Sequence, residues 1–162
     1  RVGKAAPDFH RTGAYGRPLD RSGDAGQVVV LHFWDYRGTP EAPFGQVGYL
    51  DFLANKRAKD GVRVYGIAID ERLADAELAP LARREVRQFC SQFIRVSYPV
   101  AIDDGSLLGV FGDPRPLSAS LPLWIVIGRD GTVLHHKAGL YLIDPNRGLE
   151  ELNAIVSQAA TN

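Results

Sequence analysis

Side chains that could do chemistry gather at one place in the sequence, directly after the apolar run at residues 28–34. That run is continuous rather than alternating, which is typical of a strand covered on both faces of a sheet. A polar turn follows, and a helical pattern begins near Pro43. Ligands of open α/β sheets bind where such a strand ends beside a helix N-terminus. The sequence therefore predicts a site built from these residues: Trp34, Asp35, Tyr36, Arg37, Gly38, Thr39, Pro40 and Glu41.

Three side chains near this turn could titrate or bind a metal, namely His32, Asp35 and Glu41. Each also has an ordinary structural interpretation. A histidine inside an apolar strand is commonly a satisfied core residue, and an acid in the first turn of a helix is stabilised by the free amides there. The sequence contains no cluster with zinc spacing and no glycine-rich phosphate loop. We therefore expect no metal and no cofactor.

Composition sets the class of protein. The 162 residues fit one domain, residues 1–162, and 19 basic side chains balance 19 acidic ones. A net charge of zero gives no reason to expect nucleic acid as a partner. The apolar runs are far shorter than the ~20 residues needed to cross a bilayer. Because the sequence begins with Arg1 and contains no methionine, we expect it to be a piece of a longer precursor.

Hydrophobic periodicity predicts an alternation of strands and helices. A strand, helix, strand order over residues 28–70 predicts a right-handed parallel crossover. Asp130-Gly131 between two β-rich runs predicts a hairpin. The remaining expected elements are an N-terminal hairpin near 8–12 and 17–19, a helix ending near 93, a strand at 98–102, a helical turn at 107–111, and a last helix from Asp144-Pro145.

The single cysteine, Cys90, excludes a disulfide or a dithiol site within this sequence. Ala82, Val86, Phe89 and Phe93 share its apolar helical stripe. A thiol in such surroundings has a raised pKa and behaves as a small hydrophobe. We therefore interpret Cys90 as structural.

Four segments together resemble the thioredoxin fold, and within it the redoxin branch of TlpA-like thiol:disulfide oxidoreductases and alkyl hydroperoxide reductase-type peroxiredoxins. They are VGKAAPDF at 2–9, VVVLHFW at 28–34, YPVAIDD at 98–104 and LPLWIVIGRDGTV at 121–133. The resemblance implies an α/β fold, a three-layer α/β/α sandwich with a central mixed sheet and an N-terminal β-hairpin. Since many TlpA-like proteins work outside the cytoplasm, it also implies export.

The family's redox motif has no thiol in this sequence. An ungapped alignment places Gly38-Thr39-Pro40-Glu41 where thioredoxin has Cys-Gly-Pro-Cys, and a shifted one places Asp35 and Gly38 at the cysteine positions. The peroxiredoxin cysteine that follows a Thr-Pro is also absent, because Glu41-Ala42 follows Thr39-Pro40. Disulfide exchange and peroxide reduction both need a thiolate at this helix end.

Other family features are present. By the resemblance, His32 occupies the position of a buried acid that assists thioredoxin cysteines, and Pro122 matches the cis-proline that presents backbone to an extended peptide. Leu121 and Pro122 therefore join the candidate binding surface, with a protein or extended peptide as the expected partner.

Three functions remain open. The first is a redox-inactive binding or structural module, which is the leading interpretation. The second is an oxidoreductase or peroxidase that uses Cys90 with a partner thiol. The third is non-thiol chemistry at His32, Asp35 and Glu41. His135 and His136 point to opposite faces of a strand and are not expected to share a metal. The sequence does not predict an oligomeric state.

Overall fold

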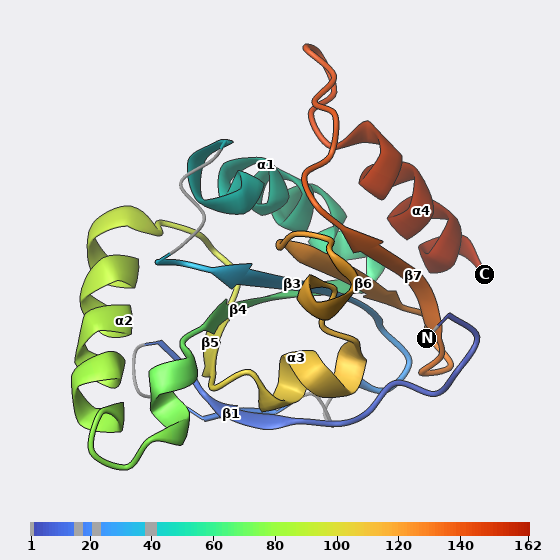
Figure 1. Ribbon diagram of the computed structural model, residues 1–162. Helices are drawn as coiled ribbons and strands as arrows, with labels where there is room; N and C mark the ends of the chain where they lie inside the picture. Colours follow the sequence, from blue (N-terminus) through green and yellow to red (C-terminus); the bar gives the residue numbers. More distant parts are fainter. Residues whose placement is uncertain (1, 15–17, 21–23, 38–41) are drawn as a thin grey trace.

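A mixed five-stranded sheet with the strand order β5-β4-β3-β6-β7 forms the centre of the protein, as shown by a computed structural model that describes residues 2–14, 18–20, 24–37 and 42–162 (Figure 1). The strands are β1 (His10–Thr12), β2 (Pro18–Asp20), β3 (Val28–Asp35), β4 (Val62–Ile69), β5 (Val100–Asp103), β6 (Leu123–Ile127) and β7 (Val133–Ala138). The helices are α1 (Ala42–Arg57), α2 (Ala79–Phe93), α3 (Ser106–Phe111) and α4 (Glu150–Thr161). Short 3₁₀ turns occupy Ala58–Asp60, Glu71–Ala74 and Arg115–Leu117.

Strand β3 lies in the middle of this sheet. It pairs in parallel with β4, from Val28 opposite Val62 to Asp35 opposite Ile69, and antiparallel with β6. Residues 28–34 are all buried, which confirms the strand predicted from the continuous apolar run. The parallel β3-α1-β4 unit is the predicted crossover.

Successive residues of β3 point to opposite faces of the sheet, and each face has its own core. Val28 and Val30 pack with residues of α1, α2 and α4, whereas Val29, Leu31 and Phe33 pack with α3 and with Phe9. Helices therefore cover both faces (Figure 1). The predicted three-layer α/β/α sandwich is confirmed.

The N-terminal hairpin is also present. Strands β1 and β2 pair antiparallel, and Gly13 forms a bridge with Ala101 on β5. Arg11 Nε donates to the buried Asp103 carboxylate at 2.7 Å. The same carboxylate accepts the amides of Gly105, Leu107 and Leu108. Asp103 thus joins the hairpin to the start of α3.

Two local expectations are wrong. The last helix begins at Glu150, not at Asp144, because the Asp144 carboxylate accepts the amides of Asn146 and Arg147 and closes a turn there. Gly148, at φ +65°, ends that turn in a conformation that favours glycine. Phe93, placed by periodicity on the buried stripe, is 52% exposed because it is the last residue of α2.

Arg129 holds three distant segments together at one corner of the fold. Its guanidinium donates to the carbonyl oxygens of Gly26, Asp60 and Ala160 at 2.8 to 3.2 Å. These carbonyls precede β3, precede β4 and lie near the end of α4, respectively. As for membranes, none of the helices in the described part of the chain has the length and apolar character required to span one.

Candidate functional site

The predicted site lies where β3 ends and β6 begins. Phe33 pairs with Leu123, so the next residues outward, Trp34 and Pro122, are neighbours across the two strands. The candidate residues Gly38, Thr39, Pro40 and Glu41 lie outside the described part of the chain, which resumes with α1 at Ala42. The described parts of the site are therefore residues 34–37 on one side and residues 121–122 on the other.

Burial divides the candidate residues into two groups. Trp34 and Tyr36 are only 1% and 7% exposed, so they belong to the core and do not form a contact surface. Pro122 is also buried, and its peptide bond with Leu121 is cis. Arg37 is exposed, whereas Asp35 and Leu121 are partly buried. Among the described residues of the site, Asp35, Arg37 and Leu121 therefore have exposed surface.

Two hydrogen bonds fix the first turn of the site loop. The Asp35 carboxylate accepts the backbone amide of Arg37 at 3.0 Å. The Tyr36 hydroxyl donates to Asp70 Oδ2 at 2.7 Å, which ties the loop to the end of β4. The Tyr36 ring also packs against Phe89 of α2, with ring centroids 5.2 Å apart. The loop thus leaves the sheet along a defined path.

Asp70 is the centre of a charged cluster beside this loop. Arg72 binds it with both ends of the guanidinium, Nε at 3.0 Å and Nη2 at 2.7 Å, and the same Nη2 reaches Glu85 at 3.0 Å. Burial raises the pKa of the Asp70 carboxyl, but the hydrogen bonds from Arg72 and Tyr36 outweigh burial and hold that pKa below its usual value. Burial and the Asp70 carboxylate both raise the pKa of Tyr36.

Sequence reasoning missed this cluster, although a signal was available. Asp70 follows the second buried strand, at the same edge of the sheet as the turn after β3. Carboxyl ends of adjacent parallel strands meet at one edge, so an acid there lies close to the first site loop.

His32 and Asp35 leave β3 in different directions. The two residues differ by three positions along a strand, so their side chains leave opposite faces of the sheet. His32 is fully buried between the two tryptophans, 4.4 Å from the Trp124 ring and 6.1 Å from the Trp34 ring by centroid. Among the described residues, no group of three or more potential metal ligands is present.

The aromatic cluster continues from Trp124 towards the surface. Trp124 donates its indole N–H to the Gly139 carbonyl and packs edge-on against Tyr141, with centroids 4.9 Å apart. The Tyr141 hydroxyl lies 2.6 Å from His135 Nε2. Burial lowers the pKa of His135. His136 instead lies near Gly112, so the two adjacent histidines serve different neighbours.

A second feature that sequence reasoning missed fixes the start of α1. Gln46 is buried, and its side-chain amide donates to the Tyr141 carbonyl at 2.8 Å and accepts the Tyr141 amide at 3.0 Å. Its φ of +70° is uncommon for a residue other than glycine. The paired hydrogen bonds offset that conformational cost. A lone glutamine in a helical pattern carries no sequence signal for such a contact.

Cys90 lies on the buried face of α2 with no exposed surface. Burial raises the pKa of its thiol to about 12. Because the thiolate is the reactive form, burial and the raised pKa both disfavour reaction of this sulfur in the folded protein.

The sheet order, the cis-proline beside the β3 end and the helix that follows define a protein of the thioredoxin-like class. A family model for the AhpC/TSA family matches residues 2–136, and the chain belongs to that family. Its relatives include the thiol-disulfide oxidoreductase ResA of Bacillus thuringiensis and that of Bacillus anthracis. Each is 29% identical over 140 residues, covering 85% of this chain and 70% of the relative.

Solved structures agree with this assignment. A thiol:disulfide interchange protein DsbE from Chlorobium tepidum is 25% identical with a TM-score of 0.69, covering 99% of this chain and 98% of the other. A secreted Mycobacterium tuberculosis disulfide oxidoreductase homologous to E. coli DsbE is 21% identical with a TM-score of 0.59, covering 93% and 95%. The predicted redoxin family is thus confirmed. The Mycobacterium tuberculosis structure, at 21% identity, supports the fold alone.

Proposed function

We propose that this chain is a thioredoxin-fold binding module that does not perform dithiol exchange, and that its ligand is an extended segment of a protein lying beside Leu121 and Pro122. The observation that carries this proposal is the state of the only sulfur nucleophile: Cys90 has no exposed surface and a pKa of about 12. Thiol exchange requires an accessible thiolate.

Backbone groups at the site support peptide binding. The described residues offer no hydrogen-bond partner for the backbone N–H and C=O of Leu121, which precedes β6, whereas the Pro122 carbonyl accepts the Gly139 amide at 2.8 Å. An extended peptide that aligns with Leu121 would satisfy these groups, as in β-strand addition. The exposed guanidinium of Arg37 lies on the other side of the site and favours segments with acidic side chains.

The activity in the names of the relatives is not carried over, because an oxidoreductase of that kind requires thiols that this sequence lacks. Pairing Cys90 with a partner's thiol is the alternative, and the burial of Cys90 weighs against it. Export is part of the proposal, and the secreted Mycobacterium tuberculosis protein of the same fold supports it.

Two measurements on the purified protein test the proposal. Reduction of insulin by dithiothreitol should proceed at the same rate with and without the protein. Amide NMR spectra recorded during titration with reduced, carboxymethylated α-lactalbumin, an unfolded polypeptide without free thiols, should show shifts of the amide signals of residues 35–37 and Leu121. Arg37→Ala should weaken this binding, whereas Arg84→Ala, on the exposed face of α2, should not.

The outcomes separate the alternatives. Insulin reduction that disappears in Cys90→Ala would establish the thiol enzyme and reject the inert module. Shifts confined to residues outside this edge, or no shifts at any concentration, would reject the peptide site even if the redox assay remained silent.

A further inference from the structure

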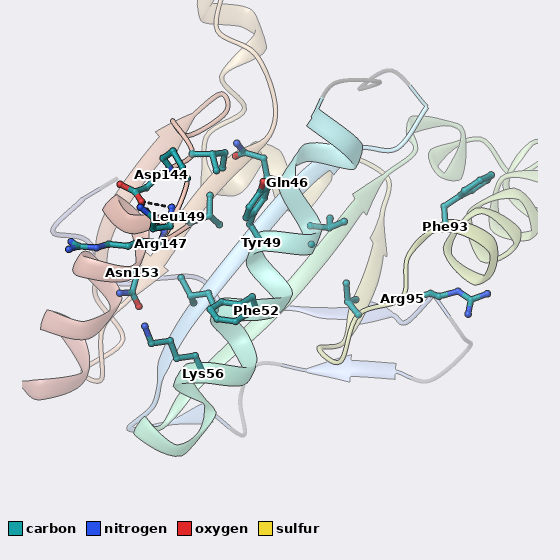
Figure 2. A pocket seen from close by; sticks show the side chains of 18 residues that line it. Gln46, Tyr49, Phe52, Lys56, Phe93, Arg95, Asp144, Arg147, Leu149 and Asn153 are labelled. Carbon is teal, nitrogen blue, oxygen red and sulfur yellow. Dashed lines mark hydrogen bonds between the residues drawn. The ribbon is translucent and has the colours of Figure 1, made fainter.

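The outer face of α1 carries a groove of about 780 Å³ that the proposed function does not use. One wall is formed by the turn at residues 143–149 and by Asn153 of α4, and the groove extends past α1 to the residues that follow α2. Figure 2 shows Tyr49 and Phe52 on α1 facing the first wall, with Phe93 and Arg95 on the other side of the helix. Its volume is within the range of ordinary ligand sites.

The floor of the groove is an aromatic ridge. Tyr49 and Phe52 are 46% and 68% exposed, and their spacing of three residues places them on one face of α1. Tyr49 lies against Gly148, where an added Cβ would be 3.2 Å from the Tyr49 ring. Phe52 projects further and presents most of its ring to water. Contiguous exposed apolar surface of this kind marks an interaction site.

Two basic side chains line the groove: Lys56, one turn after Phe52 on α1, and Arg95, on the other side of that helix (Figure 2). Within the described parts of the chain, Lys56 and Arg95 have no ion-pair partner, although both line the groove. The acid in the wall, Asp144, is occupied by the amides of Asn146 and Arg147. Arg147 itself pairs with Glu150. The two groove charges without an ion-pair partner, those of Lys56 and Arg95, are thus both positive, although the net charge of the chain is zero. These positive charges favour an occupant with acidic side chains.

The backbone around the groove argues for a helix as the occupant. Asp144 and Gly148 exchange both of their hydrogen bonds with each other at 2.9 Å, so this wall offers no free edge to an extended strand. Gly48 is exposed, and an added Cβ there would meet nothing within 4 Å, so a partner can approach the α1 backbone one turn before Phe52. An apolar ridge between charges is the surface that amphipathic helices recognise.

We propose that this groove docks an acidic amphipathic helix of a partner protein, with the helix's apolar stripe on Phe52 and its acidic flanks at Lys56 and Arg95. From Gly48 to Lys56 the α1 ridge is roughly 12 Å long, which matches two to three turns of a partner helix. The inference goes beyond the peptide site at Leu121. The two can be tested separately, because the residues that line the groove include none of the described residues of the first site, 34–37 and 121–122.

The test uses a fluorescent, end-capped peptide of about 16 residues, with leucine at i, i+3, i+4 and i+7 and glutamate at the flanking positions. A second peptide carries lysine in place of each glutamate. Fluorescence anisotropy should show that the full chain binds the acidic peptide at least ~10-fold more tightly than the basic one, a difference of about 1.4 kcal/mol. Added salt should weaken the acidic complex.

Variants locate the binding. Phe52→Ala should weaken the acidic peptide about 10-fold, as expected for a contact residue at the centre of an interface. The double variant Lys56→Glu and Arg95→Glu should reverse the preference between the two peptides. Leu117→Ala and Arg84→Glu serve as matched controls, since Leu117 is 84% exposed and Arg84 is exposed away from the groove. Both controls should bind like the unchanged protein.

Several results would overturn the inference. Equal affinity for the two peptides, or binding that survives Phe52→Ala, would show that the groove does not recognise such a helix. Tight binding of dodecanoate without binding of the peptide would assign the groove to a carboxylate amphiphile. Self-association that Phe52→Ala abolishes would assign it to a second copy of this chain.

Discussion

The Tyr36 hydroxyl donates a hydrogen bond of 2.7 Å to Asp70, and through it the turn that follows β3 is anchored to the carboxyl end of β4. This contact connects the site loop to an ion pair whose carboxylate is buried, because Asp70 is also held by Arg72. The geometry of the site therefore depends on residues far from it in the sequence.

The Asp70 cluster should contribute to the free energy of unfolding, and this contribution should depend on pH in the acidic range. Asp70→Asn removes the more buried of the two carboxylates that pair with Arg72 and should lower the free energy of unfolding by about 2 kcal/mol. Tyr36→Phe removes one hydrogen bond and should cost about 1 kcal/mol. Urea denaturation at pH 7 measures both. A cost for Asp70→Asn below that of Tyr36→Phe would contradict the central role given to the carboxylate.

The sign of the pH effect follows from the pKa of Asp70, which is lower in the folded protein than in the unfolded chain. Its contribution is present above the unfolded pKa of about 3.9 and is lost as the pH falls through the folded pKa. The difference in stability between Asp70→Asn and the unchanged protein should therefore become smaller as the pH is lowered from 5 towards about 2. Thermal unfolding over this range tests it.

His135 should produce a second, separate pH effect. Burial lowers its pKa, so the unfolded chain binds the proton more strongly than the folded one. Stability should be full above the unfolded pKa of about 6.5 and fall as the pH drops below it. Glu151 opposes the shift, whereas Lys137 and His136 reinforce it. Melting temperatures of His135→Gln should vary less between neutral and mildly acid pH, with His136→Gln as the control.

Cys90 should resist alkylation in the folded protein. Its pKa of about 12 leaves almost no thiolate at pH 8, and no surface of the residue is exposed. Reaction with Ellman's reagent should therefore be slow without denaturant and fast in guanidinium. Cys90→Ser should destabilise the protein more than Cys90→Ala, because serine buries a hydroxyl, by about 1 kcal/mol or more. Rapid native labelling would reopen the thiol-enzyme alternative.

The paired contacts of Gln46 can be separated from its unusual backbone. Gln46→Ala and Gln46→Gly both remove the two hydrogen bonds to Tyr141, and both should destabilise the protein by about 2 kcal/mol. Alanine must still adopt φ of +70°, whereas glycine adopts it freely. Alanine should therefore cost about 1 kcal/mol more than glycine in urea denaturation. The reverse order would show that the backbone relaxes on substitution.

Restoring thiols tests whether the scaffold itself still supports exchange. Gly38→Cys combined with Glu41→Cys follows the ungapped alignment, and Asp35→Cys with Gly38→Cys follows the shifted one. Asp35 lies within β3 and pairs with Ile69, so a cysteine there is held in the strand rather than at the helix end. Insulin reduction should therefore appear in the first double variant and not in the second. Activity in the second double variant alone would favour the shifted alignment over the ungapped one.

The fold could be predicted from the sequence because its signals are local. The apolar run of β3, the periodicity of α2 and the Asp130-Gly131 hairpin each report on neighbouring residues. The start of α4 was misplaced because Asp144-Pro145 also begins a turn, and only the bridge to Gly148 decides between them.

The site was predicted less completely, for a physical reason. Its location follows from the end of β3, but the contacts that shape it join residues 34 to 95 positions apart, such as Tyr36 with Asp70 and Gln46 with Tyr141. No local pattern carries such pairings. Trp34 and Tyr36, named as candidate surface residues, are buried in the structure, because aromatic residues at a strand end suit both a core and an interface.

The position of Arg129 has a consequence for how the protein unfolds. The Arg129 guanidinium binds a residue just before β3, a residue just before β4 and the last turn of α4. Detaching any one of these segments therefore disturbs the side chain that also holds the other two. Fraying at the C-terminus is thereby coupled to the middle of the sheet. A nick or deletion there should be felt at Gly26, more than a hundred residues earlier in the chain.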